Sequence, residues 1–385
     1  MEKEIKTLDS NNTWDIVPYN PTIKPLKTRW VYKYKESNNS DLIELKARFI
    51  AKGFKQLYGL DYIETFANVI KQMAWKLVFA LAVINKWLIY KIDMLSAFTQ
   101  GGIDTSIYLI PPLGLELIYP NAKDKLLKLN KALYGLKQSA RIWYYTLTNI
   151  LINELGFKVL QAESCILINT NTNIIVCVYV DDLAIISPSK PNIDSLINSI
   201  KKYFKIKELG LIKDYLGIKI DFNLEEHYMK LTQTSYIDKV LEKFNMQNSN
   251  PISTPLDSKT KLEPNKEKAS KENIKYFQSL IGSLLYITLG TRLDIAYSVI
   301  KLSRFASNPS EIHITMGKRI LRYLKGSKEL GITYSLKSNS NNYIRGYCDS
   351  DYAGDIPTSK STSSYIFYLA NGPISWKSKL QSIIA

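Results

Sequence analysis

The chain has 385 residues, enough for two or three domains, and with 45% hydrophobic and 22% charged residues it has the composition of a folded protein. Lys and Arg number 51 against 35 Asp and Glu, and the resulting net charge of +16 favours a polyanionic partner, either nucleic acid or an anionic membrane surface. Three scattered cysteines without a CxxC pair and only two histidines exclude a disulfide framework, a cysteine zinc site and a histidine-rich metal centre.

No membrane-spanning segment is predicted. The most apolar stretch, residues 77–90, is interrupted by Asn85 and Lys86, whereas a span needs roughly 18 or more apolar residues. The first ten residues carry acids and no apolar core, so no secretory signal is predicted. We therefore expect a cytoplasmic protein without a membrane partner.

The elements expected in chain order begin with an irregular segment over residues 1–45, broken by one strand at 29–34. Basic and apolar residues alternate over 46–58, which predicts a strand with Lys46 and Arg48 on one face. A linker rich in proline, serine and charge is predicted over 249–274. Four β-like runs are expected after residue 330. Apolar spacing predicts helices at 72–88, 139–155, 191–205, 275–289, 293–306 and 311–326.

Two adjacent acids follow the most strand-like segment of the chain. Residues 174–180 are rich in β-branched side chains and lead into Asp181 and Asp182, and residues 183–186 form a second apolar run. This pattern predicts a β-hairpin with both acids at its bend. Another acid, Asp93, lies near the end of the β-run 88–94. One explanation is a solvated Asp-Asp turn; the other is a site where a cation neutralises acids that a basic chain holds together.

Clustered aspartate oxygens are ligands suited to Mg²⁺. Two such ions about 3.5–4 Å apart can activate an attacking hydroxyl and stabilise a leaving phosphate. In a basic protein this chemistry indicates nucleotidyl transfer or cleavage of nucleic acid. Because successive strand residues point to opposite faces, Asp181 and Asp182 are not expected to contribute equally.

Several segments resemble the reverse transcriptase region of copia-type LTR retrotransposon Pol polyproteins and occur in that family's order. They are YVDD at 179–182, KIDMLSAFTQG at 91–101, KALYGLKQSARIWY at 131–144, KARFIAKGFKQ at 46–56, NNTWDIVP at 11–18, YLGIKI at 215–220, STPL at 253–256, IGSLLY at 281–286 and RILRYLKG at 319–326. A lone YVDD is a weak signal, whereas this series covers nearly the whole chain.

The resemblance implies an α+β right-hand polymerase followed by a partial RNase H-like α/β domain. Fingers, palm and thumb would occupy 1–248, a linker 249–274, a helical connection 275–330 and the truncated RNase H-like domain 331–385. In that last segment Asp349 would be the first metal ligand. No Asp or Glu follows Asp355, so we expect no RNase H activity from this chain.

The function implied by the resemblance is RNA-directed DNA polymerase. Asp93, Asp181 and Asp182 would be the catalytic residues and would bind two Mg²⁺ ions, with Mn²⁺ as an alternative. The implied partners are an RNA template, a DNA primer, dNTPs and the flanking Pol domains of the parent polyprotein, within a virus-like particle if the element is active.

The resemblance also implies residues that bind the nucleotide and the primer. Phe98 would lie beneath the incoming sugar and exclude a 2′-hydroxyl. Leu216 and Gly217 would lie in the hairpin that grips the primer, where glycine allows close backbone approach. The nucleotide would be held by Lys46 and Arg48 at its triphosphate and by Tyr134 and Gly135 at its sugar and base.

Other hypotheses stay open at this point. Phe98 and Tyr134 could be plain core aromatics, and Lys46 and Arg48 could line a solvated strand face. Departures from the family pattern favour a non-catalytic nucleic-acid-binding remnant; they are Ala140, Leu293, Thr105, Ser106 and Gln278. A third hypothesis is a metal-dependent nuclease or phosphatase that uses the same acids.

Overall fold

The computed structural model describes residues 1–385 except 37–42, 123, 258–259, 337–342, 356–357 and 385. The chain divides into two compact units. The first comprises Met1–Ile70, Lys91–Ile185 and Lys190–Leu209, and the second comprises Lys71–Tyr90, Ile186–Ser189 and Gly210–Ala385. Both units combine helices with sheets, which confirms the predicted α+β class.

The α-helices in the described residues are α1 (Glu2–Ser10), α2 (Gln72–Ile84), α3 (Ser139–Asn153), α4 (Lys190–Lys201), α5 (Thr234–Lys243), α6 (Lys271–Gly290), α7 (Ala296–Ser303) and α8 (Glu311–Gly326). Short 3₁₀ turns are η1 (Gly53–Lys55), η2 (Ala97–Gln100), η3 (Leu115–Leu117), η4 (Pro120–Ala122) and η5 (Leu293–Ile295).

Two small sheets and one large sheet contain the strands up to residue 211. The order β1-β6-β5 joins β1 (Trp14–Pro18), β6 (Lys125–Leu129) and β5 (Tyr108–Leu109). A two-stranded sheet joins β2 (Thr28–Glu36) and β3 (Ile43–Ala51). The large sheet has the order β11-β4-β10-β9-β8-β7, formed by β11 (Ile206–Leu211), β4 (Leu88–Met94), β10 (Asp182–Ser187), β9 (Ile174–Tyr179), β8 (Glu163–Asn169) and β7 (Lys158–Leu160).

Two further sheets lie in the second unit. One has the order β12-β13-β14-β15, formed by β12 (Asp214–Tyr215), β13 (Ile218–Asn223), β14 (Tyr228–Thr232) and β15 (Ile332–Ser335). The other has the order β16-β17-β18, formed by β16 (Arg345–Ser350), β17 (Thr362–Leu369) and β18 (Gly372–Leu380). The first β-like run after residue 330 thus pairs with β14, with Ile332 opposite Leu231.

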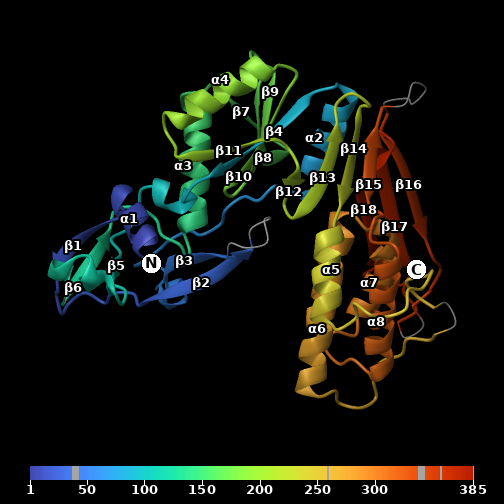
Figure 1. Ribbon diagram of the computed structural model, residues 1–385. Coiled ribbons are helices and arrows are strands. Elements are labelled where there is room, and N and C mark those ends of the chain that lie inside the picture. Colours follow the sequence, from blue (N-terminus) through green and yellow to red (C-terminus); the bar gives the residue numbers. More distant parts are fainter. Residues whose placement is uncertain (37–42, 123, 258–259, 337–342, 356–357, 385) are drawn as a thin grey trace. The chain divides into compact units, whose positions relative to one another are not determined.

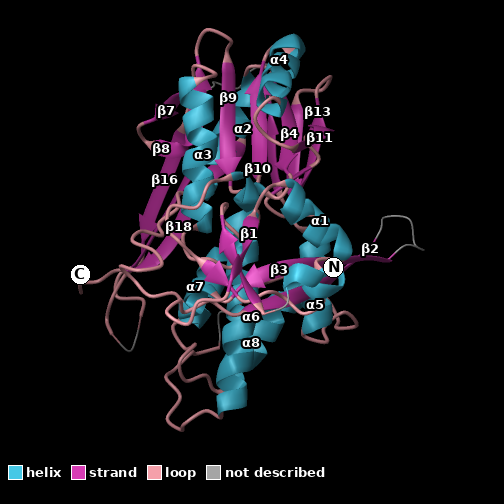
Figure 2. Ribbon diagram, turned by 90° about the vertical axis from the view of Figure 1, so that its left-hand side faces the viewer, coloured by secondary structure: helices cyan, strands magenta, loops and turns pink. Residues whose placement is uncertain are grey.

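The large sheet carries the motif-bearing strands of the first unit. Strands β8, β9 and β10 are mostly apolar and are buried along most of their length, as expected for strands covered on both faces. Helix α3 lies alongside them (Figures 1 and 2), and the Tyr144 hydroxyl donates a hydrogen bond to the carbonyl of Ser164 at 2.9 Å. The sheet is therefore a fixed support for its loops.

The expectation of an irregular segment over residues 1–45 is wrong at its start. Helix α1 forms there because Ile5 and Leu8, spaced by three residues, are both buried at 1% exposure. Two apolar residues among polar neighbours give too weak a period to predict a helix. Strand β1 follows and buries Trp14.

Three other elements are shorter than predicted. The basic strand ends at Ala51 rather than continuing to residue 58, and the chain then makes the turn η1. The predicted helices 72–88 and 191–205 end at Ile84 and Lys201. The predicted strands at 29–34 and 88–94 and the helix at 311–326 are confirmed.

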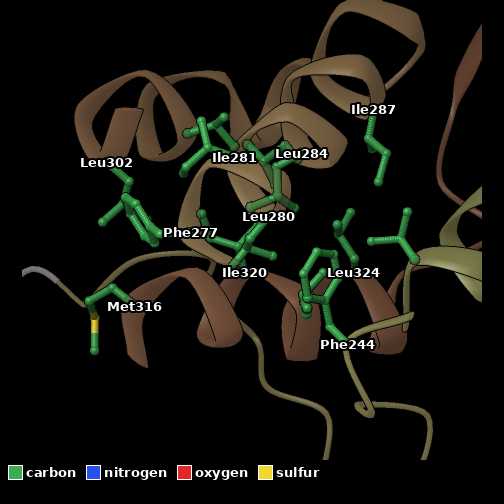
Figure 3. Close-up of a cluster of buried hydrophobic side chains, with 14 of the residues drawn as sticks. Phe244, Phe277, Leu280, Ile281, Leu284, Ile287, Leu302, Met316, Ile320 and Leu324 are labelled. Atoms are coloured by element: carbon green, nitrogen blue, oxygen red, sulfur yellow. The ribbon is translucent and has the colours of Figure 1, made fainter. Parts of the chain in front are cut away.

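Helices α5 to α8 of the second unit pack around one apolar core (Figure 3). The labelled side chains are buried and come from α6, α7 and α8 and from the residue that follows α5; they are Phe244, Phe277, Leu280, Ile281, Leu284, Ile287, Leu302, Met316, Ile320 and Leu324. Helix α6 begins after Ser270, whose hydroxyl accepts a hydrogen bond from the backbone N–H of Asn273. Among the described residues, no helix has both the length and the apolar character needed to cross a membrane.

We predict that this core carries much of the stability of the second unit. Leu280→Ala removes a fully buried side chain and should lower the free energy of unfolding by about 2–5 kcal/mol. Urea titration followed by circular dichroism measures it. Leu289→Ala on the same helix, at a side chain that is 54% exposed, is the matched control and should change stability by about 0.5 kcal/mol or less. Equal losses in the two variants would contradict the prediction.

Candidate active site

The predicted hairpin of β9 and β10 is confirmed, but only Asp181, not both acids, lies at its bend, which is strained. Val180 and Asp181 form the bend, and Asp182 is the first residue of β10. Val180 has a φ of 52°, a left-handed conformation that a β-branched side chain rarely adopts. The indole N–H of Trp143 on α3 donates to the Val180 carbonyl at 2.7 Å and so holds the bend in place.

Strand β4 brings the third aspartate to this bend. β4 and β10 are neighbours in the sheet, and the backbone N–H of Met94 donates to the carbonyl of Asp181 at 2.9 Å. Asp93 precedes Met94 and is half-buried, as are Asp181 and Asp182. The three carboxylates predicted from the sequence therefore lie around one junction between adjacent strands.

The electrostatics of the junction show that these carboxylates repel one another. Burial raises the pKa of Asp93, and the charges of Asp181 and Asp182 raise it further, while Lys91 and Lys46 act in the opposite direction. Burial is also the main cause of the raised pKa of Asp181. The charge of Asp182 adds to it, and Arg48 and Lys91 oppose it. The junction thus favours the binding of a cation.

The donor chemistry fits a hard divalent cation, but the three carboxylates do not form one closed cluster. Among the described residues, no group of three or more His, Cys, Asp or Glu side chains could hold a metal ion. The carboxylate of Asp182 is paired instead with the ammonium of Lys91, at 3.1 Å from Nζ to Oδ1. Asp93 and Asp181 remain as the carboxylates that could hold a cation.

The basic strand β3 supplies two cations whose charges act on these carboxylates. Lys46 is exposed and Arg48 is half-buried, two residues apart and so on one face of the strand. The guanidinium of Arg48 lies 5.3 Å from the ring centre of Tyr134, and the ring of Phe98 meets that of Tyr134 edge-on at 5.0 Å. Burial raises the pKa of the Tyr134 hydroxyl to about 12.

Gly135 lets the two motif-bearing segments approach closely. Its φ is 91°, and a Cβ there would lie 2.2 Å from the carbonyl oxygen of Ala51. The backbone N–H of Ala51 donates to the Tyr134 carbonyl at 2.9 Å. A side chain at position 135 would separate Tyr134 from the end of β3.

Two buried glutamines join the same segments, a link that was not predicted from the sequence. Gln138 is fully buried and accepts a hydrogen bond from the amide of Gln56 at 2.9 Å. Gln56 accepts the backbone N–H of Lys137 at 2.8 Å, and Gln138 donates to the carbonyl of Asp61 at 2.8 Å. Gln56 ends the quoted motif KARFIAKGFKQ and Gln138 lies within the quoted motif KALYGLKQSARIWY, which was the available signal.

Lys91 and Trp143 were also missed as parts of this site. Lys91 lies two residues before Asp93 in a predicted strand, so strand periodicity alone places both on one face. Trp143 lies in a predicted helix, and nothing in the sequence indicates that its indole reaches the bend.

The remaining predicted residues belong to the second unit. Leu216 and Gly217 form the turn of the β12–β13 hairpin, and both have a positive φ, of 51° and 76°. The hydroxyl of Tyr286 donates to the Leu216 carbonyl at 2.8 Å, and a Cβ on Gly217 would meet that hydroxyl at 2.5 Å. Asp349 is exposed on β16.

We predict that neutralising Asp93 stabilises the protein when metal is removed by a chelator. Because the pKa of the folded state is raised, ionisation of Asp93 opposes folding as pH rises above its ordinary range, and this penalty disappears at lower pH. Asp93→Asn should therefore be more stable than wild type at pH 7, with a smaller difference at pH 4. Urea unfolding at both pH values measures it; the exposed Asp15→Asn is the control. A destabilised Asp93→Asn at pH 7 would refute this reasoning.

The glutamine pair should contribute to stability as a buried hydrogen-bonded unit. Gln138→Leu leaves the amide of Gln56 with only a 3.4 Å contact to the Asp61 carbonyl, and should cost about 1–3 kcal/mol of unfolding free energy. Urea titration measures the loss, and Gln247→Leu at an exposed position is the control. A change no larger than that of the control would show that the pair is energetically neutral.

Comparison with known proteins identifies the family. Residues 11–258, more than half of the chain, match the family model described as reverse transcriptase (RNA-dependent DNA polymerase). The Pol polyprotein of transposon TNT 1-94 from Nicotiana tabacum is 36% identical over 100% of this chain and 29% of its own length. That of transposon RE1 from Arabidopsis thaliana is 35% identical over 99% of this chain and 26% of its own length.

A solved structure also aligns, a foamy viral protease-reverse transcriptase in complex with double-stranded DNA. Its TM-score is 0.45 at 13% identity, over 98% of this chain and 64% of that chain, a likeness too low to add to the assignment. The chain spans less than a third of the length of the two Pol polyproteins. The matched family model and the polyproteins together show that the chain belongs to the reverse transcriptase family, in the form carried by copia-type retrotransposon Pol polyproteins.

Proposed function

We propose that this chain supplies the RNA-directed DNA polymerase centre of its polyprotein, extending a DNA primer on an RNA template with dNTPs. The observation that carries the proposal is the junction of β4 with the β9–β10 bend, where the charges of Asp181 and Asp182 act on Asp93 beside the cations of β3. Acids that repel one another in a protein of net charge +16 suit a reaction in which a cation and phosphates meet.

The proposed metal site uses the carboxylates of Asp93 and Asp181, with Asp182 beside them. Two Mg²⁺ ions, or Mn²⁺ in their place, would supply activation of the primer hydroxyl and charge stabilisation at the phosphates. In the reaction, the primer 3′-oxygen loses its proton to solvent and bonds to the α-phosphorus. The bond from that phosphorus to the bridging oxygen breaks, and pyrophosphate leaves.

The other residues would bind and orient the nucleotide. Lys46 and Arg48 lie on the same face of β3, where both can face the triphosphate. The ring of Phe98, held edge-on against Tyr134, would form the floor beneath the sugar and would collide with a 2′-hydroxyl. Tyr134 and Gly135 would contact the sugar and base, and Leu216 and Gly217 would meet the primer backbone.

The positive charge of the chain would hold the template and primer through their phosphates. Such binding falls steeply with salt and does not depend on the carboxylates of the metal site. We further propose that the flanking segments of the parent polyprotein complete the enzyme, and that it acts inside the cell.

We predict that Asp181→Asn abolishes extension without loss of nucleic-acid binding. Removing one carboxylate of the metal site should lower the extension rate by roughly a thousandfold. Extension of a labelled DNA primer on an RNA template in Mg²⁺ and dNTPs measures the rate. A filter-binding titration at several salt concentrations measures the affinity, and Asp15→Asn is the matched control.

Three outcomes are informative. Extension by wild type that disappears in Asp181→Asn supports the polymerase. Salt-sensitive binding by a folded wild type that gives no extension would leave a nucleic-acid-binding remnant in its place. Degradation of the nucleic acid in Mg²⁺ without dNTPs would favour a nuclease.

A further inference from the structure

We propose that Lys91 is a positioning residue that holds the Asp182 carboxylate away from the metals, so that Asp93 and Asp181 alone face them. This inference rests on the proposed function and deepens it. It assigns to Asp182 a role different from that of Asp93 and Asp181, and gives a role to a lysine that the sequence motif does not single out.

The geometry places Lys91 inside the junction. It lies on β4 two residues before Asp93, on the same face of the strand, and β4 is adjacent to β10, where Asp182 begins the strand. The side chain of Lys91 is 8% exposed and that of Asp182 is 25% exposed, with 3.1 Å between Nζ and Oδ1. The pair is therefore largely shielded from water.

Burial makes a counter-charge necessary for the lysine. An ammonium taken out of water needs a counter-charge, and removing one partner of a buried pair leaves an uncompensated charge. Asp182 supplies that counter-charge from the neighbouring strand. Its carboxylate is thereby committed to the contact and is not free to turn toward an ion near Asp93. Lys46, by contrast, is exposed on β3.

The pair also explains the incomplete cluster of acids. Within the described part of the chain no three acids could close around a metal ion, although Asp93 feels the charges of both Asp181 and Asp182. With the Asp182 carboxylate paired to Lys91, the site offers the carboxylates of Asp93 and Asp181. Its affinity for a divalent cation should be lower than three would give.

Metal affinity of the full chain without nucleic acid tests the proposal. Lys91→Met keeps the length of the side chain and removes its charge, and should bind Mn²⁺ about tenfold more tightly because Asp182 becomes available. Lys91→Arg keeps the pair and should match wild type. Electron paramagnetic resonance of free Mn²⁺ during titration gives the dissociation constant, and circular dichroism reports folding.

A double-variant comparison separates positioning from simple charge repulsion. If Lys91 acts through Asp182, Lys91→Met should have no effect on Mn²⁺ affinity in an Asp182→Asn background. Equal tightening in both backgrounds would overturn the proposal, because charge alone would then explain it. Unchanged affinity of a folded Lys91→Met in the wild-type background would overturn it as well.

The outcomes also separate this inference from the polymerase assignment. Loss of Mn²⁺ binding in Asp93→Asn together with no effect of Lys91→Met would remove the role of Lys91 and leave the metal site standing. Mn²⁺ binding that is unaffected by Asp93→Asn would remove the metal site itself. If Lys91→Met does not fold, Lys91→Gln, which keeps a hydrogen-bond donor, replaces it; we expect tighter Mn²⁺ binding than wild type, and affinity equal to wild type would overturn the proposal.

Discussion

Repulsion between neighbouring carboxylates is the constraint on which the site depends. Because β4 and β10 are adjacent, they bring together Asp93, Asp181 and Asp182. The backbone hydrogen bond from Met94 to Asp181 fixes how far one strand is shifted along the other. Burial strengthens the repulsion by removing water. Three cations partly offset the repulsion. Lys91 lies within the sheet, and Lys46 and Arg48 lie on β3.

The rest of the first unit holds this arrangement rigid by contacts from outside the sheet. Trp143 fixes the strained bend at Val180, and Tyr134 contacts both the ring of Phe98 and the guanidinium of Arg48. Strain at a bend next to acidic side chains is typical of sites where geometry is prepared before a ligand arrives. A flexible bend would let the carboxylates move apart to relieve their repulsion.

Much of this could be predicted from the sequence where one local pattern was strong. The hairpin at 174–186 and the strand at 88–94 follow from apolar β-branched runs, and the acids at their ends pointed to a metal-dependent phosphoryl reaction. Helix α1 escaped prediction because it buries only Ile5 and Leu8. The pairing of β15 with β14 escaped it too, because strand partners distant in sequence leave no local period.

The contacts between side chains were the part of the site that could least be predicted from the sequence. Strand periodicity could place Lys91 beside Asp93, but not the carboxylate of Asp182 within reach of it. The link between Gln56 and Gln138 spans 82 positions, and each residue alone looks like an ordinary polar loop residue. The family resemblance identified the motifs at 46–56 and 131–144, but it did not show that they contact each other.

That contact makes the segments 46–56 and 131–144 one packed unit. The side-chain amide of Gln56 bonds to Gln138, and the backbone N–H of Ala51 bonds to the Tyr134 carbonyl beside a glycine where a Cβ would have no room. A substitution at Gln56, Gln138 or Gly135 would therefore disturb both segments at once.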